Sequence, residues 1–172
     1  MGLCAWPGTG KTTLLTRLLP RLRLWGLRVA VIKHAHERFD LDQPGKDSYV
    51  IRQAGACQML IASRQRMALT TERSAAAEPT LADSLTLLDP RTVDLVLVEG
   101  FKREPFPKIE LHRPSLGLPL LCGEIPHIVA VASDDPHLHL PRELPLLDLA
   151  AIDGIARFIL DQLEIDPRGA LP

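Results

Sequence analysis

The sequence predicts an α/β layered fold with a largely parallel sheet and added antiparallel strands. Short β-rich runs that are apolar on both faces occur at residues 28–33, 93–98 and 128–132, as expected for buried parallel strands. Stretches with apolar residues at helical spacing occur at 11–25 and 152–163. Because strands alternate with helices along the chain, a mainly parallel sheet with helices packed on it is the expected arrangement.

The other expected elements come from shorter patterns. Residues 3–5 form an apolar run that ends in a turn, as a buried strand does. Only four residues precede Ala5, so this strand is expected to be short, with a few native residues missing before it. The alternating run 108–112 is expected to be an edge strand, and with the pair within 57–71 it suggests the antiparallel pieces. The remaining predictions are helices at 47–55 and 81–88, strands at 57–62 and 67–71 joined by the turn 63–66, and loops at 34–46 and 134–146.

Length and composition narrow the classes of protein. The chain has 172 residues, which suits one domain. We expect that domain over 1–165, followed by a flexible tail at 166–172. A net charge of −1 argues against a protein that coats nucleic acid or an anionic membrane, and an aromatic content of 4% argues against a stacking platform for single strands.

The sequence also predicts a cytoplasmic location. No apolar run reaches the ~18 residues of a membrane span, and the first residues lack the pattern of a signal peptide. The three cysteines, Cys4, Cys57 and Cys122, are far apart in the sequence. They are expected to be buried thiols in a reducing compartment.

The charge distribution indicates a small anionic ligand. Residues 1–36 contain no Asp or Glu but carry six Lys and Arg side chains, and the first acid is Glu37. A locally positive end on an otherwise neutral protein suits a small anion better than a polymer.

A phosphate-binding loop is predicted at residues 5–12, where A-W-P-G-T-G-K-T follows a strand and opens a helix. The run fits G-x-x-x-x-G-K-[ST] except that Ala5 stands at the first position. Gly8 and Gly10 permit backbone angles that turn successive N–H groups inward around phosphate oxygens, and Thr9 lies between them. The helix that follows adds the positive end of its dipole.

The side chains that follow the loop complete the predicted nucleotide site. Lys11 places a cation at the β- and γ-phosphates, Thr12 offers a hydroxyl to Mg²⁺, and Thr13 can bond the α-phosphate. The alternative is a glycine turn beside an exposed lysine.

An acid at the end of a second strand is expected beside this loop. Glu99 follows the apolar run 94–98, and ligands of parallel α/β sheets bind at the carboxyl ends of strands. Glu99 is predicted to hold Mg²⁺ through water or to orient an attacking water. Lys11 and Glu99 are therefore the predicted catalytic residues. The alternative is a solvated acid at a strand end.

The polar loop 34–48 also follows a strand. Lys46 and Asp47 are predicted to contact phosphate and Mg²⁺ respectively, because the loop could sense the nucleotide and a second substrate. His34 and His36 lie near several Asp residues, so a dedicated zinc or nickel site is the alternative.

A third acid, Asp134, follows the strand at 128–132. A carboxylate can accept hydrogen bonds from both N1–H and N2–H₂ of guanine, whereas adenine offers no such pair. Asp134 is therefore the predicted guanine reader. The usual N-K-x-D signature is absent, and an Asp that caps the following turn is the alternative.

Several motifs together resemble one family, the molybdopterin-guanine dinucleotide biosynthesis adapter proteins, protein B of that pathway. The resemblance covers about residues 1–163, and the P-G-K-D-S and V-E-G-F-K runs are its most specific parts. The segments that carry it are 5–13, 32–36, 40–48, 68–72, 98–102 and 130–134.

The resemblance implies a P-loop NTPase-like fold that binds GTP with Mg²⁺ and hydrolyses it slowly. It further implies a homodimer and a partner, the guanylyltransferase that joins GMP to molybdopterin, with molybdopterin as a further candidate ligand. The positions that it assigns to phosphate and metal are Gly8, Gly10, Lys11, Thr12 and Thr13, with Glu99 beside them.

The leading interpretation is a GTP-binding adapter with weak GTPase activity. Hydrolysis would be in-line attack of water on the γ-phosphate, with Lys11 and Mg²⁺ offsetting the developing charge. Two alternatives stay open. One is a small-molecule kinase that holds an acceptor hydroxyl in the 34–48 loop, and the other is a metallochaperone GTPase that uses His34 and His36 as ligands.

Overall fold

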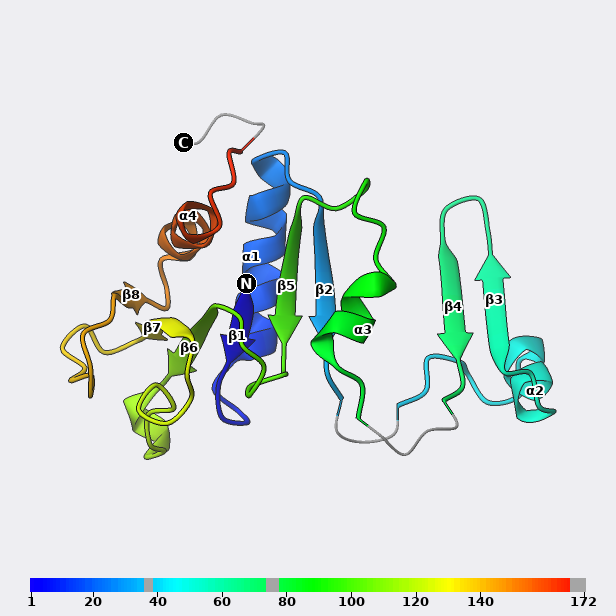
Figure 1. Cartoon of the computed structure of the whole chain (residues 1–172), viewed down its shortest axis with the longest axis horizontal. Coiled ribbons are helices and arrows are strands. Elements are labelled where there is room, and N and C mark those ends of the chain that lie inside the picture. Colours follow the sequence, from blue (N-terminus) through cyan, green and yellow to red (C-terminus); the bar gives the residue numbers. More distant parts are fainter. Residues whose placement is uncertain (36–38, 74–77, 168–172) are drawn as a thin grey trace. The chain divides into compact units, whose positions relative to one another are not determined.

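The computed structural model describes residues 1–35, 39–73 and 78–167, and the chain forms two compact units (Figure 1). The first unit contains Met1–His34 and Thr80–Pro172, and the second contains Ala35–Pro79. The expectation of one domain over 1–165 stays a prediction. Most of the predicted flexible tail, residues 168–172, lies outside the described residues.

The first unit contains a six-stranded sheet in which every pair of neighbours is parallel. The strand order is β2-β5-β1-β6-β7-β8, which places β1 and β6 in the middle. The carboxyl ends of all six strands therefore meet at one edge. The strands are β1 (Gly2–Cys4), β2 (Val29–Lys33), β5 (Leu95–Glu99), β6 (Lys108–His112), β7 (Ile128–Ser133) and β8 (Leu146–Asp148).

Two helices pack on one face of this sheet, and a third contributes to a cluster with Val98 of β5. Helices α1 (Lys11–Leu24) and α4 (Ile152–Gln162) pack on one face, where their apolar stripes join Leu3, Leu97 and Leu111 in the main core. Arg21 of α1 forms an ion pair with Asp153 of α4. Helix α3 (Leu81–Thr86) contributes Leu81 to a smaller cluster, and the short η1 (Pro114–Leu116) follows β6.

The prediction of an edge strand at 108–112 was wrong, and so was its suggested antiparallel pairing. Strand β6 is central, it runs parallel to β1 and β7, and all five of its residues are buried. Its polar side chains are paired rather than solvated. The Lys108 ammonium donates to the carbonyls of Glu104 and Phe106, and the Glu110 carboxylate accepts from the amides of Leu121 and Cys122 at 2.7 and 2.8 Å. Buried charges are tolerated where they are satisfied in this way.

Two further expectations need correction. The predicted loop 134–146 overlaps the start of β8, a short parallel edge strand. Cys57 is exposed, whereas Cys4 and Cys122 are buried as expected. No helix in the described part of the chain is long and apolar enough to cross a lipid bilayer.

The second unit contains helix α2 (Asp47–Gln53) and an antiparallel hairpin of β3 (Gln58–Ala62) and β4 (Met67–Thr71). The Ser63 amide donates to the Arg66 carbonyl across the turn at 2.8 Å, which confirms the predicted pair of strands and its connection. An arginine of α2, Arg52, forms ion pairs with Asp40, Asp42 and Glu72.

Candidate functional site

The loop between β1 and α1 has the backbone of an anion cradle. Gly8 and Gly10 have φ angles of 80° and 104°, which only glycine adopts without strain. A Cβ added to Gly8 would meet nothing within 4 Å, so the outer side of the loop is open. Gly10 precedes α1 and offers no side-chain cap, and the first turn of α1 contains no acid. The amides at the start of α1 are thus suited to an anionic ligand.

Lys11 lies folded over this loop. Its ammonium donates to the carbonyls of Ala5 at 3.2 Å and Trp6 at 3.3 Å. Burial lowers the pKa of Lys11 below its ordinary value, and Lys102 and Lys33 lower it further, whereas the Glu99 carboxylate raises it. Lys11 therefore interacts electrostatically with the other charged side chains at this edge of the sheet.

Three threonines surround the loop in different roles. Thr9 is 2% exposed, and its hydroxyl donates to the Trp6 carbonyl at 2.9 Å, so it holds the loop from inside. Thr12 and Thr13 begin α1 with exposed side chains. Their hydroxyls are accessible to a ligand that sits over the first turn of the helix.

Glu99 ends the neighbouring strand β5 and lies at the same edge. Its side chain is 14% exposed, and its carboxylate is 3.9 Å from the Lys33 ammonium. The turn that follows requires glycine, because Gly100 has φ 104° and a Cβ there would approach the Cβ of His34 to 2.6 Å. The His34 ring stacks on the Phe101 ring with 4.4 Å between centroids. The turn is therefore packed firmly against the end of β2.

Lys102, in the turn that follows Glu99, adds a further cation. Its ammonium lies 5.5 Å from the centre of the Trp6 ring, a cation–π contact with the loop itself. The Trp6 indole N–H donates to the Pro119 carbonyl at 2.8 Å, which fixes the ring. Lys102 thus belongs to the positive surroundings of the loop.

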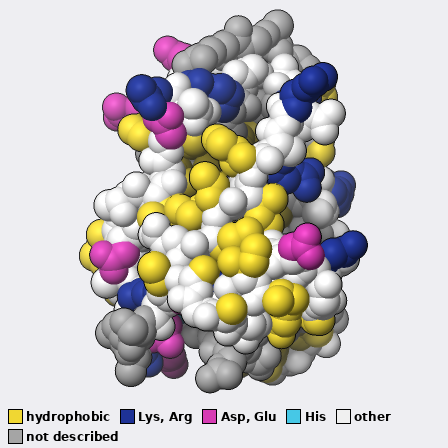
Figure 2. Space-filling model, turned by 90° about the vertical axis from the view of Figure 1, so that its right-hand side faces the viewer, with side chains coloured by type: hydrophobic (Ala, Val, Ile, Leu, Met, Phe, Trp, Pro, Cys, Tyr) yellow, Lys and Arg dark blue, Asp and Glu magenta, His cyan; other side chains and the backbone are white. Residues whose placement is uncertain are grey.

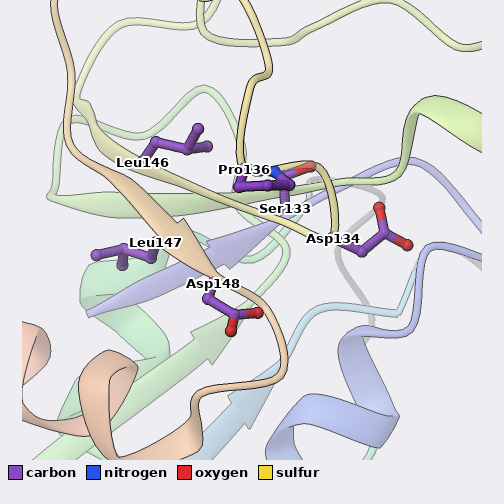
Figure 3. A pocket seen from close by; sticks show the side chains of 6 residues that line it. All are labelled: Ser133, Asp134, Pro136, Leu146, Leu147 and Asp148. Atoms are coloured by element: carbon purple, nitrogen blue, oxygen red, sulfur yellow. The ribbon is translucent and has the colours of Figure 1, made fainter.

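Asp134 follows β7 and forms an ion pair with Arg113, the residue that follows β6. Arg113 also donates from Nε to the Thr9 carbonyl at 3.0 Å, so it connects Asp134 to the loop between β1 and α1. Beside them the ends of β7 and β8 enclose a cavity of about 350 Å³ (Figure 3). Its lining residues are Ser133, Asp134, Pro136, Leu146, Leu147 and Asp148.

Arg113 and Asp148 are the residues of this region that the sequence argument missed. Arg113 comes directly after β6, and Asp148 is the last residue of β8. The position of each at the carboxyl end of a parallel strand was the available signal. This signal was not used, because the strand before Arg113 was expected at the edge of the sheet and the segment 134–146, which overlaps β8, was expected to be a loop.

Some predicted residues lie elsewhere in the chain. Lys46 and Asp47 lie at the start of α2 in the second unit, so their contacts with nucleotide stay predictions. His36 lies outside the described residues. Within residues 1–35, 39–73 and 78–167, no group of three or more His, Cys, Asp and Glu side chains is arranged to hold a metal ion.

The fold and this loop define a class, a parallel α/β protein with a glycine-rich loop between its first strand and first helix. The model of the family of molybdopterin guanine dinucleotide synthesis protein B matches residues 1–134. The chain belongs to this family.

Relatives and solved structures agree with this assignment. The chain is 44% identical over 165 residues to the molybdopterin-guanine dinucleotide biosynthesis adapter protein of Escherichia coli (strain K12), which covers 95% of this chain and 93% of that protein. The protein of the same description from Haemophilus influenzae is also 44% identical, over 161 residues, with 92% and 86% covered.

The fold is similar to a crystal structure of molybdopterin-guanine biosynthesis protein B. The TM-score is 0.71 at 27% identity, over 94% of this chain and 97% of that one. A MobB protein homolog from Bacillus stearothermophilus gives a TM-score of 0.68 at 26% identity, over 95% and 96% of the two chains. The predicted family and fold class are confirmed.

Proposed function

We propose that this protein is a cytoplasmic GTP-binding adapter with slow GTPase activity in molybdopterin guanine dinucleotide biosynthesis. It would assist the guanylyltransferase that attaches GMP to molybdopterin. The observation that carries the proposal is the loop at residues 5–12, whose two left-handed glycines and uncapped helix start suit a polyphosphate. The descriptions of the Escherichia coli and Haemophilus influenzae relatives support the pathway and the adapter role.

The residues at the loop would hold the triphosphate and its metal. The amides of residues 8–13 take the phosphate oxygens, and Lys11 moves from the Ala5 and Trp6 carbonyls to the β- and γ-phosphates. The Thr12 hydroxyl and the Glu99 carboxylate are the oxygen donors that Mg²⁺ prefers, and bound Mg²⁺ would offset phosphate charge. Glu99 would orient the attacking water. Slow GTP hydrolysis does not require an arginine from a partner protein to stabilise the charge of the transition state.

Guanine recognition is assigned to Asp134. Its carboxylate lies at the rim of the 350 Å³ cavity, whose volume is at the low end of the ~300–1,000 Å³ range of ligand sites and suits a single base. The hydrophobic wall from Leu146 and Leu147 would pack against the base, and Asp134 would accept its N1–H and N2–H₂ groups.

A homodimer is supported by exposed apolar residues of the second unit. A two-stranded hairpin is marginally stable alone in water, and this one exposes large apolar side chains. Figure 2 shows hydrophobic side chains at the surface on the side of the molecule that it draws. Leu60 and Leu69 are opposite each other in the register of β3 and β4, on the same face as Met67. A second copy of this chain would cover such a face. The exposed fractions are 58% for Leu60, 54% for Leu69 and 74% for Met67.

Calorimetry with Mg²⁺ tests the proposal directly. GTP is expected to bind in preference to ATP, and Lys11→Ala should abolish binding, whereas Lys46→Ala separately tests the second-unit contact. Equal affinity for the two nucleotides would remove the guanine assignment.

A dinucleotide-forming assay with the guanylyltransferase at limiting GTP, with and without this protein, tests the adapter role. Unchanged yield would contradict it, and consumption of GTP in proportion to an added acceptor would indicate a kinase.

A further inference from the structure

One guanidinium group connects two parts of the site that are far apart in the sequence. Arg113 donates from Nε to the Thr9 carbonyl at 3.0 Å and pairs through Nη1 with Oδ2 of Asp134. Its Nη2 also lies 4.0 Å from the position that a Cβ would occupy on Gly10. The same planar group therefore touches the phosphate loop and the acid at the end of β7.

The sheet order produces this placement. Strand β6 lies between β1 and β7, and all three run parallel. The residue after β6 is therefore adjacent both to the loop after β1 and to the acid after β7. Arg113 is that residue, and its arm bridges the two neighbours across the carboxyl edge.

We propose that Arg113 is a positioning residue for base recognition. It holds the Asp134 carboxylate at a fixed distance from the phosphate loop, so that one nucleotide contacts both at once. This inference rests on the proposed function, because it assigns Asp134 to guanine and residues 8–13 to phosphate. Arg113 acts through Asp134 and the loop, so it needs no contact with the base.

The contact geometry is compatible with a bound guanine. A carboxylate has about four lone-pair sites, and Arg113 uses one of them at Oδ2, which leaves acceptors for N1–H and N2–H₂. The pair is also too exposed to be a major source of stability, with the two side chains 37% and 41% exposed. Its main effect is orientation, since the donors of a planar guanidinium stand in a rigid fork, whereas a lysine ammonium is a point charge on a flexible stem.

The test compares GTP and ATP affinities of Arg113→Gln and Arg113→Lys with those of the unmodified protein, in Mg²⁺, by calorimetry. Loss of the loop contact should weaken both nucleotides slightly. Loss of the Asp134 contact should weaken GTP by about tenfold, so the preference for GTP over ATP falls severalfold. A purely structural arginine would weaken both nucleotides equally, and that outcome would overturn the inference.

A double variant and a matched control sharpen the result. Asp134→Ala should remove the same preference, and Arg113→Gln added to it should reduce the preference no further. Arg142 is the control, because it too donates to two acceptors, in its case the backbone carbonyls of Cys122 and Ile128 rather than Thr9 and Asp134. Arg142→Gln should leave the preference unchanged. Thermal unfolding of each variant identifies any that fail to fold. If Arg113→Gln fails to fold, the preference for GTP over ATP is measured on Arg113→Lys instead.

The experiment separates the two hypotheses. If the unmodified protein shows no preference for GTP, the guanine assignment fails and this inference fails with it. If the preference is present and survives in both Arg113 variants, only the inference on Arg113 is wrong.

Discussion

Glu99 of β5 lies in register with Leu3 of β1, two residues before Ala5, where the glycine-rich loop begins. The parallel pairing of these strands therefore brings an acid from the middle of the chain to the edge where the loop lies. Burial lowers the pKa of Lys11, and the negative charge of Glu99 partly offsets this effect by raising it. This placement supports the role that we propose for Glu99 at the loop.

Replacing Glu99 should separate binding from hydrolysis. Glu99→Gln keeps the size of the side chain but removes the charge that would orient water, so GTP hydrolysis should fall by at least about tenfold. GTP affinity should change much less, because the loop amides and Lys11 are retained. Single-turnover release of phosphate measures the first quantity and calorimetry the second. Glu124→Gln is the control at an exposed acid, and a Glu99→Gln protein with undiminished hydrolysis would exclude the role.

The affinity for GTP should depend on pH through Lys11. Burial lowers the pKa of this lysine below its ordinary 10.5, and only the protonated form attracts phosphate. Affinity should therefore be lost as the pH rises through the lowered pKa, at a lower pH than for an ordinary lysine. Calorimetry across the alkaline range measures the midpoint. Arg is charged throughout that range, so Lys11→Arg should lose the part of the pH dependence that Lys11 causes, in whatever binding it retains.

Much of this arrangement could be predicted from local patterns, and the main exception, strand β6, has a physical cause. The loop at 5–12 and the strand that ends at Glu99 have strong local signals, a glycine-lysine motif and an uninterrupted apolar run. Strand β6 does not, because its alternating Lys108, Glu110 and His112 look solvated until their buried partners are known. The partners of Lys108 and Glu110 lie in loops, whose conformation depends on tertiary contacts. The position of Arg113 depended on that strand and was missed with it.

The three cysteines should react at very different rates. Burial is the main cause that raises the pKa of Cys4 to about 12, and it also raises the pKa of Cys122, so both remain protonated and shielded near pH 8. Cys57 is exposed in the second unit. A thiol-specific alkylating reagent should modify Cys57 alone in the folded protein and all three cysteines after denaturation. Mass spectrometry of the peptides measures this, and rapid labelling of Cys4 in the folded protein would contradict the buried position of β1.

Asp134→Asn should change the base that the protein prefers. The asparagine amide can donate a hydrogen bond to the C2 carbonyl of xanthine, whereas the Asp134 carboxylate accepts from the amino group of guanine. Affinity for GTP should fall by at least about tenfold, and affinity for xanthosine triphosphate should rise. Competition of the two nucleotides for the protein measures the exchange. Asp135→Asn, at the next residue, should leave the preference for GTP intact, and an unchanged preference in Asp134→Asn would exclude Asp134 as the reader.

Charges placed on the apolar face of the β3–β4 hairpin should shift the protein from dimer to monomer. Leu69→Lys puts an ammonium at a position that is 54% exposed in the single chain but would be buried against a second copy. Burying an unpaired charge is costly, so the dimer should dissociate at concentrations where the unmodified protein is dimeric. Sedimentation velocity measures the state. Gln65→Lys, in the turn of the same hairpin, adds the same charge away from that face and should leave the dimer intact. If Leu69→Lys also remains dimeric, the second copy is held by another surface.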